Sequence, residues 1–184
     1  MANTVSNVTA GKPKIAGAIA IAPKGSTLPT DSTSALDAAF MQVGYVSEDG
    51  VVNSNSPSVE TIRAWGGDVV LTTSSEKPDD FSFTLIEALN INVLKLIYGE
   101  NNVTGTLETG IVVKANNNNQ DEWAIVIDML LRNDVTKRIV IPSATVTEVG
   151  DITYADSDAV GYETTVSAQP DTAGNTHYEY IAAP

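Results

Sequence analysis

The stretch FSFTLIEALNINVLKLIYG, residues 81–99, changes its hydrophobic period halfway along, and this change constrains the fold more than any other feature. In the first half, Phe81, Phe83 and Leu85 alternate with polar residues, which is the period of a strand with one buried face. The second half has helical spacing and predicts a helix over residues 89–98. The residues expected to pack this helix into the core are Leu89, Val93, Leu94, Ile97 and Tyr98.

The predicted helix has plausible ends. Asn90 is suited to capping its start, and Gly99 supplies a left-handed stop. A strand that runs into the one convincing helix of the chain implies a single helix lying against a β-structure.

Most of the remaining chain alternates in short runs separated by turn clusters. Turns every 8–12 residues are typical of a β-sandwich or barrel, so we expect a mainly β fold with one flanking α-helix. One strand is expected to stop at Pro142. The other strands are predicted over residues 14–22, 39–46, 61–65, 68–73, 106–114, 123–129, 137–141, 144–149, 152–154, 160–168 and 176–181.

The 184 residues suit a single domain, 1–184. Residues 1–11 are polar and unpatterned, and we expect a flexible N-terminal arm. Residues 47–60 contain the polar run NSNSPS and predict a long exposed loop. Gly66 and Gly67 are expected to hinge two strands as a hairpin.

Charge is the strongest feature of the composition. Ten Lys and Arg against 23 Asp and Glu give a net charge of −13, which disfavours electrostatic gripping of nucleic acid. It does not exclude a protein past which nucleic acid moves without binding.

No run approaches the roughly 18 apolar residues of a membrane span, and the run after Lys12 predicts a strand rather than an export signal. We therefore expect no membrane association and no secretion through the general pathway.

Residues suited to chemistry are sparse. The chain has no cysteine and a single histidine, His177, so we expect no catalytic, cofactor or metal site. The acidic pairs Asp121-Glu122 and Asp156/Asp158 lie in predicted turns, where solvated carboxylates are the rule, although adventitious calcium binding stays open. Trp65 and Trp123 are expected in the core.

Several stretches resemble the major tail protein, or tail tube protein, of long-tailed bacteriophages (siphoviruses), in particular those of Gram-positive hosts. They follow one another in order from about residue 40 to the C-terminus. The matching segments are GYVSEDG (44–50), IRAWGGDVV (62–70), FTLIEAL (83–89), VLKL (93–96), YG (98–99), RIVIP (138–142), VGD (149–151) and GNTH (174–177).

The resemblance implies a β-sandwich or barrel with one helix, hexameric rings, and stacking of these rings into a hollow tube. It implies a virion protein made in the host cytoplasm, with no catalytic residues and no cofactor. The implied partners are further copies of the chain, the tape-measure protein, the tail terminator and the baseplate or tip proteins. Double-stranded DNA would pass through the tube during genome ejection without specific binding.

Stacking of rings needs a surface distinct from the one that closes a ring. We expect it in the polar excursion, with a merely disordered loop as the alternative. The residues concerned are Ser47, Glu48, Asp49, Asn53, Ser54, Asn55, Ser56, Pro57 and Ser58. Other functions left open are the inner tube of a contractile or injection apparatus, a carbohydrate- or cell-binding β-sandwich or virion decoration protein, and an enzyme.

Overall fold

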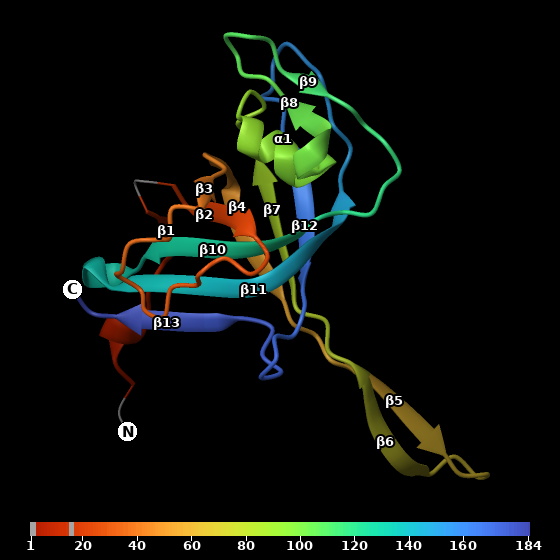
Figure 1. The fold of residues 1–184 in the computed structure, drawn as a ribbon. Coiled ribbons are helices and arrows are strands. Elements are labelled where there is room, and N and C mark those ends of the chain that lie inside the picture. Colours follow the sequence, from red (N-terminus) through yellow and green to blue (C-terminus); the bar gives the residue numbers. More distant parts are fainter. Residues whose placement is uncertain (1–2, 15–16) are drawn as a thin grey trace.

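The computed structural model describes residues 3–14 and 17–184, and within them nine strands form one antiparallel sheet (Figure 1). The order β3-β2-β10-β11-β12-β7-β4 forms its main path, while β1 pairs with β10 and β13 pairs with β11. The prediction of a mainly β fold with one helix is confirmed. The strands of this sheet are β1 (Lys12–Pro13), β2 (Ile19–Pro23), β3 (Met41–Gln42), β4 (Val46–Ser54), β7 (Asp80–Leu85), β10 (Glu122–Leu130), β11 (Thr136–Val149), β12 (Tyr162–Ala168) and β13 (Tyr178–Ala182).

Two small ribbons extend from this sheet at opposite ends of the molecule (Figure 1). One consists of β8 (Val103–Thr104) and β9 (Val112–Val113) and lies at the end that carries helix α1 (Ile91–Tyr98). The other consists of β5 (Ser58–Arg63) and β6 (Val69–Glu76) and projects away from the body. Three 3-10 turns complete the described elements, η1 (Val5–Asn7), η2 (Glu100–Asn102) and η3 (Arg132–Asp134).

The strand-to-helix transition forms as its period predicts. Phe81, Phe83 and Leu85 are buried on one face of β7. The Asn90 side chain accepts a hydrogen bond from the Asn92 amide at the start of α1, and Gly99 ends the helix with a φ of 96°. Val93, Leu94 and Ile97 are buried, and Tyr98 packs its ring edge-on against Tyr162.

Leu89 is a correction to the expected helix core. It is 69 % exposed, whereas Leu96, which is not among the residues predicted for the core, is fully buried. The helix begins only after the Asn90 cap. Leu89 therefore lies in the preceding turn, and the helical spacing of apolar residues does not apply to it.

The central strands are covered on both faces. From Trp123 to Ile127 every residue of β10 is buried, so side chains on both faces of this strand are shielded from water. β11 does not stop at Pro142 as predicted but runs through it to Val149, with 14 residues in the whole strand. The register between β10 and β11 shifts between Ile125 and Trp123, opposite this proline, so the missing N–H falls at an irregular step of the ladder.

Other strand boundaries differ from the prediction. The strand expected at 14–22 is divided between β1 and β2, and its residues 15–16 lie outside the described part of the chain. The strand expected at 39–46 shrinks to β3, because Gly44 adopts a φ of 80° and the Glu87 carboxylate occupies the place of a Cβ there. Residues 152–154 form no strand.

The prediction of a strand over residues 106–114 is also wrong. Only Val112–Val113 pairs, with Val103–Thr104, and a turn separates the two short strands. Gly105 has a φ of 88°, and a Cβ on it would stand 2.0 Å from the Gly110 carbonyl oxygen. This close backbone approach folds the segment back on itself instead of extending it.

The prediction of a long exposed loop over residues 47–60 is wrong in part. Residues 52–60 are exposed as expected, but the segment does not form a loop. Its residues belong mostly to β4 and β5, with only residues 55–57 between the two strands. Residues 3–11 are exposed, apart from Ser6, whose side chain is not described, and lie against the η3 turn. There the Arg132 amide donates to the Thr9 hydroxyl and the Arg132 guanidinium donates to the Val5 carbonyl.

We expect substitution of Leu96 and of Leu89 by alanine to change the free energy of unfolding by very different amounts. Leu96→Ala should lower the free energy of unfolding by about 2–5 kcal/mol, because it opens a cavity beneath α1. Leu89→Ala should stay within about 0.5 kcal/mol, because its side chain is mostly in water. Urea denaturation of both variants measures the difference, and equal losses would contradict the boundary at Asn90.

Candidate assembly surfaces

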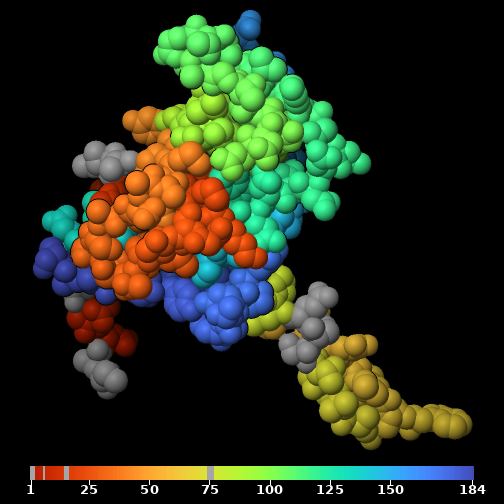
Figure 2. Space-filling model, in the orientation of Figure 1, coloured from red at the N-terminus to blue at the C-terminus, as the bar shows by residue number. Residues whose placement is uncertain are grey.

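The ribbon β5–β6 stands clear of the body in the space-filling view (Figure 2). All of β5 is exposed, as are residues 69–73 of β6. Its strands pair antiparallel, with Ile62 directly opposite Leu71. An isolated two-stranded ribbon is marginally stable in water, and this one carries large apolar side chains without a covering layer. The exposed apolar residues are Val59, Ile62, Trp65, Val69, Val70 and Leu71.

The tip of the ribbon is a tight turn that presents Trp65. Gly66 and Gly67 have φ values of 124° and 101°, a region that glycine enters without strain. The Ala64 amide donates to the Asp68 carbonyl over 2.8 Å, and the Arg63 guanidinium donates to the Gly67 carbonyl over 3.0 Å. The turn thus holds the indole outward.

Trp65 contradicts the prediction that both tryptophans lie in the core. Trp123 is buried as expected, but Trp65 has a relative exposure of 107 %. The two glycines that follow Trp65 are the sequence feature that indicates its exposure. A residue next to a tight hairpin turn rarely reaches a core. A fully exposed tryptophan on an uncovered ribbon marks an interaction surface.

The ribbon joins the body at a buried carboxylate. Asp79 is 1 % exposed and accepts hydrogen bonds from the Asn53 amide at 2.8 Å and the Thr176 hydroxyl at 2.5 Å, and it contacts His177 Nδ1 at 2.5 Å. Burial pushes the pKa of Asp79 upward, but the hydrogen bonds from Thr176, Asn53 and His177 outweigh it and hold the pKa below its usual value.

The expected stacking residues divide between two places. Ser47, Glu48 and Asp49 lie on β4, where Ser47 is half-buried. Asn53 to Ser58 form the end of β4, the short connection and the start of β5, which together make one leg of the ribbon. The structure therefore brings the second group, but not the first, to the root of the projecting ribbon.

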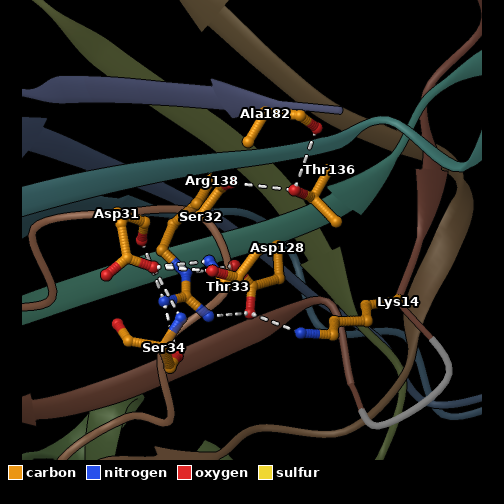
Figure 3. Close-up of polar contacts among 9 residues, drawn as sticks. All are labelled: Lys14, Asp31, Ser32, Thr33, Ser34, Asp128, Thr136, Arg138 and Ala182. Carbon is orange, nitrogen blue, oxygen red and sulfur yellow. Dashed lines mark hydrogen bonds and ion pairs between the residues drawn. The ribbon is translucent and has the colours of Figure 1, made fainter. Parts of the chain in front are cut away.

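A second buried polar cluster fixes the loop between β2 and β3 to the sheet (Figure 3). Asp128 on β10 lies directly opposite Arg138 on β11. The guanidinium donates to both carboxylate oxygens, at 2.6 Å and 2.9 Å, and to the carbonyls of Asp31 and Ser34 at 3.1 Å and 2.9 Å. Lys14 approaches the same carboxylate at 3.8 Å.

Further hydrogen bonds hold this loop against β11 and the C-terminus (Figure 3). The hydroxyls of Ser32 and Thr136 bond to each other at 2.8 Å, and the Thr136 hydroxyl also reaches the Ala182 carbonyl at 3.3 Å. The Asp31 carboxylate accepts the amides of Ser34 and Thr33, and these bonds lower its pKa to about 2. The cluster stabilises the fold and positions an edge loop without offering a reactive group.

No three His, Cys, Asp or Glu side chains of residues 3–14 and 17–184 are grouped so as to hold a metal ion. Asp156 and Asp158 are exposed. In the same part of the chain, a helix capable of spanning a bilayer is absent.

The exposed apolar ribbon is therefore a candidate surface for contact with another chain. A family model described as "Phage tail tube protein" matches residues 1–183, and the chain belongs to that family. It is a structural protein of the phage tail and a component of the virion.

No curated protein sequence matches the chain. Among solved structures it is similar to the cryo-EM structure of the anti-feeding prophage cap, described as the tube terminating cap, at 10 % identity. That similarity covers 99 % of this chain and 100 % of the other with a TM-score of 0.39, so it adds no weight to the family assignment.

We expect Asp128→Ala to destabilise the fold by about 3–5 kcal/mol, because it leaves the Arg138 guanidinium buried without its counter-charge. Lys14→Ala, which removes the half-exposed partner of the same carboxylate, should cost no more than about 1 kcal/mol. Urea denaturation measures both. A loss below about 1 kcal/mol for Asp128→Ala would contradict this role.

The lowered pKa of Asp31 predicts an acid-sensitive loop. An unfolded aspartate titrates near about 3.9. The folded group titrates at about 2, so its stabilisation is complete above the unfolded pKa and is lost as pH falls through the folded one. Carboxyl carbon NMR should give a titration midpoint of about 2 for Asp31. In Asp31→Asn the free energy of unfolding should fall less steeply as pH is lowered from the unfolded pKa to the folded one. A midpoint near about 3.9 would contradict the turn geometry.

Proposed function

We propose that copies of this chain close into hexameric rings, and that these rings stack into the tail tube through which the genome leaves the virion. The projecting ribbon with its exposed Trp65, in a chain of the tail tube family, is the observation that carries the proposal. Such a ribbon gains stability only when another chain covers its apolar side chains, and a further copy of the same chain is the partner that a tube supplies.

Ring closure and stacking would use different surfaces. β4 pairs with β7 and β13 pairs with β11, and these are the only partners of the two strands in the described chain. Their outer edges are therefore suited to lateral pairing with a neighbouring copy. The ribbon, together with its leg from Asn53 to Ser58, would make the axial contact. Ser47, Glu48 and Asp49 then belong to the lateral edge of β4 rather than to the ribbon itself.

The net charge of −13 supports a conduit that does not hold DNA. DNA carries one phosphate charge per roughly 1.7 Å of duplex, and a basic bore would add affinity at every ring. An acidic bore keeps each contact weak, so the duplex slides. The role is non-enzymatic, with the tape-measure protein inside the growing tube and the tail terminator and baseplate or tip proteins at its ends.

Negative-stain microscopy of concentrated protein, alone and with tail proteins that seed assembly, tests the proposal. The wild-type chain should form rings or hollow tubes, whereas Trp65→Ser should raise the concentration needed for tubes by about thirtyfold, the equivalent of 2 kcal/mol at an interface hot spot. The fold should stay intact, because this side chain is fully exposed.

Tyr154→Ser is the matched control, since Tyr154 is an aromatic residue with 75 % exposure on the body of the protein. It should assemble like the wild type. Tubes from Trp65→Ser at the wild-type concentration would refute the axial role of the ribbon, and the absence of any annular or cylindrical particle from the wild-type chain would refute the conduit.

A further inference from the structure

The ribbon is joined to the sheet by two short segments that lack ladder pairing. The last pair of β4 with β7 is Ser54 with Asp80, and the first pair of β5 with β6 is Ser58 with Glu76. Residues 55–57 and 77–79 between these pairs are not in strands. The ribbon direction relative to the body is therefore set at this hinge rather than by the continuous sheet.

Asp79 is the buried point of the hinge. Its Oδ1 accepts the Asn53 amide from the other leg, and its carbonyl accepts the Ala168 amide at the end of β12. Its Oδ2 faces the Thr176 hydroxyl and His177 Nδ1. One side chain thus connects both legs of the ribbon with a third segment that is distant in the sequence.

That third segment is itself anchored by hydrogen bonds. The Asp171 carboxylate accepts the amides of Ala173 and Asn175 and the Tyr178 hydroxyl. Gln169 donates to the Ser143 carbonyl just before this turn, and β13 pairs with β11 just after it. The His177 ring also stands edge-on to Phe81 in the core, with centroids 5.4 Å apart. Thr176 and His177 therefore meet Asp79 from a fixed position.

We propose that Asp79 is a positioning residue for assembly, which locks the direction of the β5–β6 ribbon to the segment 170–177 and thereby to β13. This inference rests on the proposed function, in which the ribbon makes the axial contact. Because β13 also offers a lateral edge, the connection links the two contact surfaces of one subunit. A neighbour that pairs with β13 would tighten the segment that aims the ribbon, so ring closure would favour stacking.

A distance measurement on the soluble chain tests the lock without relying on tubes. The chain has no cysteine, so spin labels can be placed on Asp68→Cys near the ribbon tip and Glu148→Cys on β11, both exposed positions. In this labelled background we expect a single narrow distance distribution. Asp79→Asn should broaden or shift it while the sheet signal in circular dichroism is retained.

Asp80→Asn is the matched control. It makes the same chemical change one residue away, and the Asp80 carboxylate has no hydrogen bond or ion pair within residues 3–14 and 17–184. It should leave the distance distribution as in the wild type. Without labels, Asp79→Asn should also raise the concentration needed for tubes about tenfold, the effect of weakening one buried charge-assisted bond, while Asp80→Asn should not.

Thr176→Val provides the decisive second variant if Asp79→Asn fails to fold, since it keeps the shape of the side chain and removes only one donor. It should broaden the distribution less than Asp79→Asn but measurably more than Asp80→Asn. A wild-type distribution for every folded variant of this pair would overturn the lock. A broadened distribution with unaltered tubes would instead retain the lock and refute the axial role of the ribbon.

Discussion

The antiparallel ladder of β11 is the interaction on which the rest of the structure depends. The first part of this 14-residue strand lies between β10 and β13, and its last part pairs with β12. Through β12 the ladder continues to β7, and so to the strand that leads into the helix. Within the described sheet, β11 is the strand that joins β10, β2 and β3 on one side to β12, β7 and β4 on the other. Pro142 is accommodated in this strand at a register shift instead of ending it.

A buried charge lies near the start of β11, where hydrophobic packing would be expected. Arg138 is 1 % exposed, but its donors are matched by a carboxylate and two carbonyls. A buried ion pair gains little net stability over apolar packing, but removing one partner is costly because it leaves an unpaired charge in the interior. Here the guanidinium holds the loop that contains Asp31 and Ser34 against β11, and the bond between Ser32 and Thr136 adds a second contact with the same strand.

The sequence alone predicted the mainly β fold, the strand at Phe81 to Leu85, the capped helix and the hairpin at Gly66-Gly67, because each depends on local periodicity or turn chemistry. Tertiary context decided the rest. Leu89 has the right spacing for the helix but precedes its cap, and Pro142 ends a strand only where its N–H would be needed. Neither fact is visible in a single strand considered alone.

The candidate assembly surface is only partly predictable from the sequence for the same reason. The polar run places Asn53 and its neighbours at one leg of the ribbon, and their role in stacking stays a prediction. Tryptophan is so often buried that the sequence favours the core for Trp65, and the structure contradicts this. The contacts of Asp79 with Asn53 and with Thr176 join positions 26 and 97 residues apart. Such a connection has no periodic signature, so only the folded chain reveals it.

The uncovered ribbon has a consequence for the free subunit before it joins any larger particle. It carries apolar side chains that favour association, while the charge of −13 makes identical subunits repel one another. Ions shorten the reach of that repulsion to about 8 Å at physiological ionic strength, but they leave the hydrophobic attraction in place. We therefore expect free subunits to associate more readily as ionic strength rises, because added salt weakens the repulsion between acidic surfaces and leaves the apolar attraction unchanged.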